Sequence, residues 1–534
     1  MRIDIRLPGV ASIISWLSLS LSLSLSGVAA AGPDVRLADA AKRKDAIAVA
    51  ALLKQQVDVN APQMDGATAL HWAAHWNDLE TAKLLLKAGA RVDVTNDYGV
   101  TPLSLACADA GAAMVETLLL AGANPNTALP TGETPLMTAT RARNLAAVTL
   151  LLGRGANVNA KEGSHGQTAL MWAFSRDALD VARTLIDHGA DIHARSDTGF
   201  TPLLFAVREG NFDAVRLLLS RGADANEQAS DGGSVLLVAT VRGHAKLAEF
   251  LLDQGADPRA NGAGYTALHW VAGTWESQTT HEYNASPPQP AGWKDEWKAM
   301  IGVQGQAKLD LIKALLAHGA DPNARTTKLP PRFGYSFQSF VRAGGSLLGA
   351  TPFLIASAVA DVPVMRLLVA GGADPLIKTN DKTTPLMVAS GMTAIEEEHD
   401  IPESRHLEAV KLTLALGAEI NGENDLGNRA LHATGMLGYP AIAQFLVAEG
   451  HAELNPKNKA GETPLRVAEG TIVNAMFFIH ENVATVLRKL GGESDGSGVC
   501  TGTLLERASV NVKSTVCEPA GAKAAPAPVA LPKK

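Results

Sequence analysis

The sequence predicts an all-α fold, a solenoid of stacked helix–turn–helix units joined by short β-hairpin loops. A glycine–threonine–leucine signal recurs about every 33 residues, and apolar residues follow each signal at helical spacing. The composition agrees, because 46% of the residues are hydrophobic but only 5% are aromatic, which suits closely packed helices of alanine and leucine. A chain of 534 residues would otherwise suggest several globular domains, but a repeat array forms one stack.

The N-terminus has the pattern of an export signal. Arg2 and Arg6 precede an apolar stretch over residues 9–28, and three small residues, Ala29–Ala31, follow it. We therefore expect residues 1–31 to be a signal peptide, and the rest of the chain to be periplasmic or secreted without a membrane span. A retained transmembrane anchor is the alternative, since the apolar stretch approaches 20 residues.

The repeat signal is Gly-x-Thr-Pro/Ala-Leu, and each of its residues has a local role. Glycine permits the positive φ of a tight turn, threonine can cap the first helix, and proline suits the first helical position. A second helix follows and ends in Gly-Ala-Asp/Asn, where glycine terminates it in the left-handed conformation. Neighbouring signals are 32 to 34 residues apart in the first half of the chain. They begin at Gly66, Gly99, Gly132, Gly166, Gly199, Gly232 and Gly264, with later copies at Gly349, Lys382, Gly427 and Gly461.

This pattern resembles the ankyrin repeat, whose units of 33 residues open the first helix with Thr-Pro-Leu-His-x-Ala. The segments Thr68–Ala73, Thr266–Val271 and Arg429–Thr434 match that opening to varying degrees. The resemblance covers residues 34–492, with about 12 copies, of which the first and last diverge as caps would. Residues 493–519 form an appendage, and we expect the Ala/Pro/Lys-rich tail over 520–534 to be disordered.

Three insertions interrupt the array. They lie near residues 275–305, 327–348 and 391–405; the first two are rich in aromatic residues and the third is acidic. Loops inserted into a rigid stack project from it, so these are expected to carry function. The interrupted pattern resembles a group of exported bacterial ankyrin-repeat proteins, a likeness that implies location more than activity.

Tryptophan and arginine side chains are the candidate partner-binding residues. In the ankyrin family, first helices and hairpin tips line a concave face that holds partners, and Trp and Arg are enriched at binding hot spots. The alternative is that the aromatic rings on the helices pack between adjacent helices, and that those of the insertions form a small local core that holds each insertion closed. The predicted contact residues are Trp72, Trp76, Trp172, Arg176, Phe205, Arg208, Trp270, Trp275, Trp293 and Trp297.

Cysteine usage is sparse and removes several functional classes. The chain has three cysteines, and the spacing of none of them fits a Cys-x-x-Cys zinc, thioredoxin or haem pattern. We expect Cys107 to be a buried thiol inside a repeat. Cys500 and Cys517 are expected to form a disulfide in an oxidising compartment, with two free thiols as the alternative.

No catalytic, cofactor or metal site is predicted. His281-Glu282 begins like a zinc-protease motif, but position 285 is alanine where the second histidine would stand. The loop Glu396–His406 could offer mixed oxygen and nitrogen ligands, yet such loops are more often solvated charge runs. His71, His269 and His432 fall in the opening turn of their repeats, where hydrogen bonding to neighbouring turns is the expected role.

The predicted function is binding. The net charge of −7 gives no indication of nucleic-acid binding. We expect a monomeric, non-catalytic scaffold that uses its concave face to hold another protein. Two alternatives stay open: an accessory subunit whose aromatic insertions form a ligand pocket, and a secreted effector that acts on host proteins.

Overall fold

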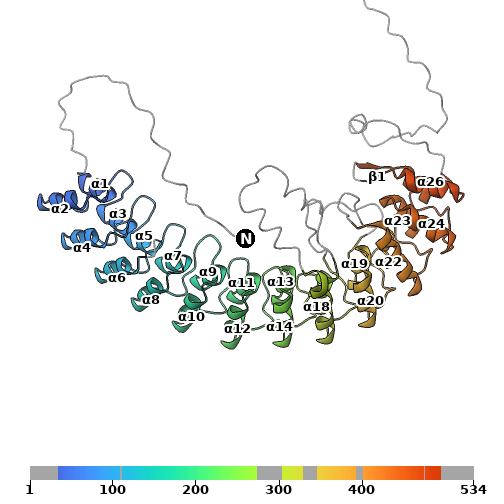
Figure 1. Cartoon of the computed structure of the whole chain (residues 1–534), viewed down its shortest axis with the longest axis horizontal. Coiled ribbons are helices and arrows are strands. Elements are labelled where there is room, and N and C mark those ends of the chain that lie inside the picture. Colours follow the sequence, from blue (N-terminus) through green and yellow to red (C-terminus); the bar gives the residue numbers. More distant parts are fainter. Residues whose placement is uncertain are drawn as a thin grey trace, which may run out of the picture. The chain divides into compact units, whose positions relative to one another are not determined.

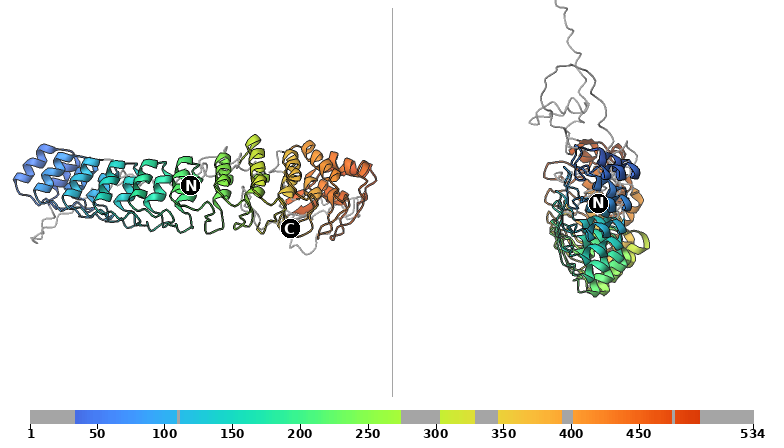
Figure 2. Two further views of the ribbon diagram at one scale, coloured as in Figure 1. Left: turned by 90° about the horizontal axis from the view of Figure 1, so that it is seen from below. Right: turned by 90° about the vertical axis from the view of Figure 1, so that its left-hand side faces the viewer.

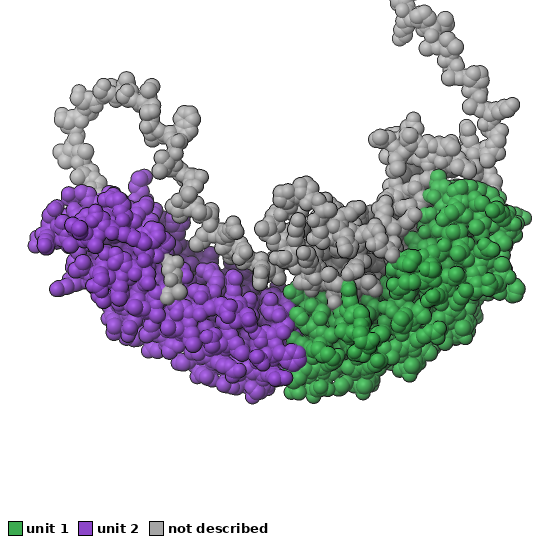
Figure 3. All heavy atoms as spheres, viewed as in Figure 1, with its two compact units in different colours: residues 1–2, 239–534 green, residues 3–238 purple. Residues whose placement is uncertain are grey.

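A computed structural model describes residues 34–108, 111–273, 303–328, 346–392, 401–473 and 476–494. The chain divides into two compact units, which are taken separately (Figure 3). Unit 2 comprises residues 3–238, and unit 1 comprises residues 1–2 and 239–534. The boundary falls inside one helix, α13 (Val235–Val241). The signal peptide and the tail predicted above lie outside the described residues.

Unit 2 is a stack of helix pairs in which a seven-residue first helix precedes a nine-residue second helix. The first helices lie side by side in one row and the second helices in another (Figures 1 and 2). The first helices are α1 (Arg36–Lys42), α3 (Ala69–His75), α5 (Pro102–Ala108), α7 (Pro135–Arg141), α9 (Ala169–Ser175) and α11 (Pro202–Arg208). The second helices are α2 (Ala46–Lys54), α4 (Leu79–Lys87), α6 (Ala112–Leu120), α8 (Leu145–Gly153), α10 (Leu179–Asp187) and α12 (Phe212–Ser220).

Helix caps explain why each pair begins and ends where it does. The Thr201 hydroxyl accepts a hydrogen bond from the Leu204 amide, and Pro202 occupies the first helical position, as the sequence predicts. Four of the six second helices of unit 2 begin at an Asp or Asn; Asn144, for example, accepts from the Ala147 amide. The other two begin at Gly111 and Ala178. They end at glycines with positive φ, such as Gly155 at 82°. The predicted helix–turn–helix unit is therefore confirmed.

Backbone hydrogen bonds join neighbouring loops between the helix pairs. The Asp97 amide donates to the Asp65 carbonyl at 2.9 Å, and the Asp197 amide donates to the His165 carbonyl at 2.8 Å. The turn glycine is needed because the next hairpin approaches closely: at Gly199, with φ 78°, a Cβ would lie 2.5 Å from the Ser230 backbone nitrogen. The expected β-hairpins are reduced here to isolated bridges.

An asparagine ladder joins the ends of the second helices. Asn126 donates from Nδ2 to the Gly155 carbonyl at 3.0 Å and accepts from the Asn157 amide at 2.7 Å. Asn159 repeats this one copy later, with the Gly189 carbonyl and the Asp191 amide. Each side chain thus satisfies backbone groups that the helix end leaves without an intrahelical partner.

Unit 1 continues the helix pairs. It contains α14 (Ala245–Asp253), α15 (Ala267–Ala272), α18 (Gly305–Ala317), α19 (Pro352–Ala358), α20 (Val362–Ala370), α21 (Pro385–Ala389), α22 (Glu403–Ala415), α23 (Ala430–Leu437), α24 (Pro440–Ala448), α25 (Pro464–Glu469) and α26 (Glu481–Lys489). Two strands, β1 (Thr471–Val473) and β2 (Met476–Phe478), form an antiparallel hairpin between α25 and α26 that pairs Ile472 with Phe477. The fold is otherwise helical in the residues described.

The hairpin ladder of unit 1 runs across the insertions without a break. The Thr327 amide donates to the Gly264 carbonyl at 2.8 Å, although the first insertion separates the two residues. The Asp425 amide donates to the Asp381 carbonyl at 2.8 Å across the third. The insertions therefore leave the stack of unit 1 in register.

A buried ion pair holds α18 in place where the first insertion rejoins the stack. Lys308 Nζ lies 2.7 Å from Asp361 Oδ2 and donates to the Gly273 carbonyl at 3.0 Å. The two side chains are only 8% and 16% exposed. Because Asp361 also caps α20 by accepting from the Val364 amide, this one contact ties α15, α18 and α20 together.

Candidate functional site

Two tryptophans at α3 lie together where the first two helix pairs of unit 2 meet, one half-buried and one exposed. Trp72 is half-buried in α3, and Trp76 caps the C-terminal end of that helix with 39% of its surface exposed. Lys42, at the end of α1, places Nζ 4.8 Å from the Trp72 ring centroid, and Lys44 lies 4.3 Å from that of Trp76. Cations over aromatic faces attract them and hold the rings in place.

Hydrogen bonds and ring contacts fix both indoles further. Trp72 Nε1 donates to Gln63 Oε1 at 2.7 Å, and Trp76 Nε1 donates to the Lys42 carbonyl at 3.1 Å. The His75 ring contacts both, with centroid distances of 6.0 Å and 4.5 Å. These tryptophans thus present apolar surface in a fixed orientation.

The same arrangement recurs three pairs later. Trp172 is half-buried in α9, and Arg141, from the end of α7, places its guanidinium carbon 5.6 Å from the ring centroid. Glu133 holds that guanidinium through an ion pair of 2.9 Å. Arg176, the C-cap residue of α9, is exposed.

We call this surface the first-helix face of unit 2. It is defined by part-exposed or cationic side chains from the middle of the first helices to the turns after them, namely Lys42, Lys44, Trp72, Trp76, Arg141, Trp172 and Arg176. The sequence-based prediction missed Lys42, Lys44 and Arg141. One signal could have revealed them: Lys42 and Arg141 end the first helix of the preceding pair, and Lys44 stands in the turn directly after it.

Two predicted contact residues require correction. Trp270 is 1% exposed and stacks on Tyr265 with a centroid distance of 6.0 Å, and Phe205 is 3% exposed beneath the guanidinium of Arg208. Buried rings of this kind cannot meet a partner, so packing between helices is the correct interpretation for these two. Arg208 itself is half-buried and pairs with Glu209 at 3.0 Å.

The repeat histidines have the structural role predicted for them. His71 Nε2 donates to the Val100 carbonyl of the next copy, while Nδ1 accepts from the Thr68 amide at 3.0 Å. His269 and His432 make equivalent bonds, and burial lowers the pKa of each to about 4. The neutral form of each imidazole fits these bonds, because one ring nitrogen accepts a hydrogen bond from a backbone amide.

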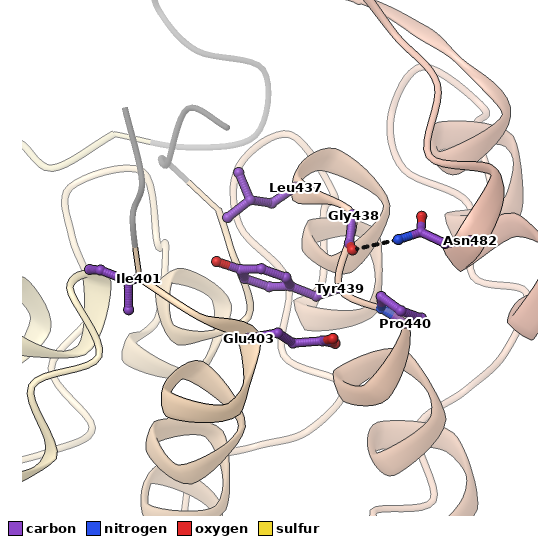
Figure 4. Close-up of a pocket in the computed structure, with 7 residues that line it drawn as sticks. All are labelled: Ile401, Glu403, Leu437, Gly438, Tyr439, Pro440 and Asn482. Carbon is purple, nitrogen blue, oxygen red and sulfur yellow. Dashed lines mark hydrogen bonds between the residues drawn. The ribbon is translucent and has the colours of Figure 1, made fainter. Parts of the chain in front are cut away.

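Unit 1 has a small hollow at the surface (Figure 4). It holds about 270 Å³, at the lower edge of the usual range for ligand pockets. Its one carboxylate, Glu403, accepts a hydrogen bond from the Ile442 amide, and Asn482 donates to the Gly438 carbonyl. The lining residues are Ile401, Glu403, Leu437, Gly438, Tyr439, Pro440 and Asn482. This set pairs no nucleophile with a base.

Other reactive groups are enclosed. Burial raises the pKa of the Cys107 thiol to about 12, which keeps it protonated and unreactive. His406, considered above as a metal ligand in a solvated loop, is instead buried in α22 and donates from Nδ1 to the Ala389 carbonyl at 2.8 Å. Within the described ranges no cluster of three histidine, cysteine or acidic residues could hold a metal ion, and no helix there is long and apolar enough to cross a membrane.

Several sequence-based predictions concern residues outside the described ranges. They are the contacts of Trp275, Trp293 and Trp297, the disulfide between Cys500 and Cys517, and a pocket formed by the aromatic insertions. These stay predictions.

The architecture defines a class, the helix-pair repeat proteins. A family model of ankyrin repeats in three copies matches residues 37–128, 105–196, 166–229 and 203–278. Ankyrin repeats are therefore present over residues 37–278, as the Thr-Pro-Leu signals there predict. Such repeats are typically non-enzymatic modules for protein–protein interaction.

Known proteins share this similarity over short stretches. Human neurogenic locus notch homolog protein 1 is 47% identical over 55 residues, which is 10% of this chain and 2% of that protein. Human protein phosphatase 1 regulatory subunit 27 is 40% identical over 88 residues, or 16% of this chain and 54% of that protein. The solved human ASB11 ankyrin repeat domain is 28% identical, covers 42% of this chain and 98% of its own, and has a TM-score of 0.38. The chain thus spans between about a fiftieth and about half of the length of these two sequence relatives.

Proposed function

We propose that this chain is a non-catalytic scaffold that binds another protein through the first-helix face of unit 2. One observation carries the proposal: Trp72, Trp76 and Trp172 keep part of their surface exposed although neighbouring groups hold them in place. Trp72 and Trp76 are held by cations, hydrogen bonds and ring contacts, and Trp172 is held by the guanidinium of Arg141. Rigid aromatic side chains lose little conformational entropy on binding, so exposed ones make strong contact residues.

The charges on the same face support a protein partner. Arginine and tryptophan together are the residues most enriched at binding hot spots, and here Arg141 and Arg176 lie on the helices that carry or adjoin Trp172. The second-helix side offers a weaker candidate, a shallow apolar groove of about 290 Å³ between α2 and α4. We favour the first-helix face because its aromatic and cationic groups recur along several pairs.

We also propose that the chain acts outside the cytoplasm, in the periplasm or beyond the cell. The support is the order of positive, apolar and small residues over 1–31. Cell fractionation with N-terminal sequencing of the recovered chain tests this proposal. An intact N-terminus in the cytoplasmic fraction would overturn it.

Site-specific photo-crosslinking tests the binding face. A benzophenone amino acid is placed in the full chain at Trp76 or Trp172, and as matched controls at Arg183 of α10 or Arg216 of α12, exposed positions on the second-helix side. The chain is then irradiated in cells of its source. We expect the same protein to be crosslinked from Trp76 and Trp172 and not from the controls. Equal yields from Arg183 and Arg216, or no protein adduct from either tryptophan position, would refute the assignment of this face.

A further inference from the structure

We infer that the segment bound on the first-helix face is an acidic, extended stretch of polypeptide. This inference rests on the proposed function and names the chemistry of the partner. It is carried by the charges that gather at the C-terminal ends of the first helices of unit 2, where the part-exposed tryptophans also lie.

Basic residues outnumber acidic ones along this edge. The cationic side chains at the helix ends and the turns directly after them are Lys42, Arg43, Lys44, Arg141, Arg143, Arg176 and Arg208. The acidic side chains in the same turns are Asp45, Asp78, Asp177 and Glu209, with Asp109 outside the described residues. All four described ones are engaged within the chain, and Asp45 and Asp78 cap α2 and α4. Asp177 accepts from Asn211 Nδ2, and Glu209 pairs with Arg208. The excess is notable in a chain whose net charge is −7, because the surface as a whole is acidic.

The geometry of the stack sets the length and spacing of such a ligand. Packed helices lie roughly 8–10 Å apart, and an extended chain advances about 3.3 Å per residue. One step along the first helices therefore corresponds to about three residues, and the path from α1 to α11 to about 15. Acidic side chains at every third position would lie opposite Arg141, Arg176 and Arg208 in turn, while apolar side chains between them reach the indoles. Arg176 is exposed, whereas a ligand carboxylate would share Arg141 with Glu133 and Arg208 with Glu209.

The opposite edge of the face argues for a polypeptide over a nucleic acid. The hairpins that precede the first helices carry exposed carboxylates, among them Asp97, Asp197 and Asp231. A nucleic acid has a phosphate at every nucleotide, so it would bring uniform negative charge against this acidic edge. A peptide can place its carboxylates on the basic edge alone.

Peptide binding to the full chain tests the inference. Three fluorescent peptides of about 15 residues repeat Glu-Leu-Ser, Lys-Leu-Ser or Gln-Leu-Ser, and a single-stranded oligonucleotide of similar reach serves as the fourth probe. The variant reverses two exposed cations, Arg43→Glu with Arg176→Glu. The control makes the same change in net charge on the second-helix side, Arg154→Glu with Arg183→Glu.

We expect the glutamate peptide to bind at least about tenfold more tightly than the lysine peptide, and to lose at least about tenfold in affinity in the first variant but less than about twofold in the control. Three results would overturn the inference: equal loss in the control, preference for the lysine or oligonucleotide probe, or no binding of the glutamate peptide. If the glutamine peptide binds best and loses its affinity in the variant Trp76→Ala, the proposed face stands while its acidic ligand does not. If no peptide binds but crosslinks form from Trp76, the binding face again stands and the acidic ligand is again refuted.

Discussion

Removing the cation of the buried ion pair at Lys308 should loosen the stack where the first insertion rejoins it. In Lys308→Met the hydrocarbon stem is largely kept, but Asp361 loses its charged partner at 2.7 Å and the Gly273 carbonyl loses its donor. Breaking a buried pair by removing one partner costs about 3–5 kcal/mol. We expect the lower end, about 3 kcal/mol, because Asp361 is 16% exposed and keeps the hydrogen bond from the Val364 amide.

The same helix offers a matched control. Lys313 pairs with Asp310 at 3.4 Å with side chains 57% and 43% exposed, so Lys313→Met should cost less than about 1 kcal/mol. A double variant, Lys308→Met with Asp361→Asn, removes the orphaned charge while asparagine still caps α20, so part of the lost stability should return.

Native-state hydrogen exchange is the suitable assay, because repeat arrays need not unfold in one step. A loss of about 3 kcal/mol corresponds to about 100-fold faster exchange in α18 and α20 of the Lys308→Met variant. If exchange in these helices changes no more than in Lys313→Met, the reasoning about the buried pair is wrong.

Three further predictions concern the repeats themselves. Because burial holds the pKa of His269 and His432 at about 4, below the unfolded value of roughly 6.5, their contribution to stability is present above pH 6.5 and is lost as the pH falls toward 4. Protonation of each of these histidines should cost about 3 kcal/mol of stability at pH 4. In the variant His269→Met, the midpoint of urea unfolding should therefore fall less as the pH is lowered. A midpoint that rises on acidification would contradict this prediction. Asn159→Ala should cost about 1–3 kcal/mol, measured by faster exchange at the end of α10, and unchanged exchange there would argue against the asparagine ladder. Trp270→Ala should lower stability by about 3–5 kcal/mol, because the ring is buried. Trp76→Ala should cost less than half as much in the same urea titration, because that ring is exposed. Similar losses in the two variants would contradict the assignment of Trp270, and not Trp76, to the core.

The helix pairs could be predicted from the sequence because their signals are local. A threonine cap such as Thr201, the proline after it and a terminating glycine such as Gly155 act within a few residues of one another, so the sequence determines where each helix begins and ends. The roles of His71 and its equivalents followed in the same way from their place in the opening turn.

The candidate site was only partly predictable, since burial depends on residues from other copies. Trp72 and Trp270 occupy the same position of their repeats, yet the first is half-buried and the second is enclosed. The lysine over Trp72 lies 30 positions earlier in the chain, so nothing next to the tryptophan indicates the contact. Position within a repeat identifies candidates, but packing across copies decides which of them a partner can reach.

The binding face is tested most directly by the indole ¹H–¹⁵N signals of the tryptophans in the full chain during titration with the crosslinked partner. Variants that replace single tryptophans with phenylalanine assign the signals, and Trp270 serves as the internal control. We expect the signals of Trp72, Trp76 and Trp172 to shift on binding while that of Trp270 stays in place. A partner that binds without moving those three signals would contradict this expectation.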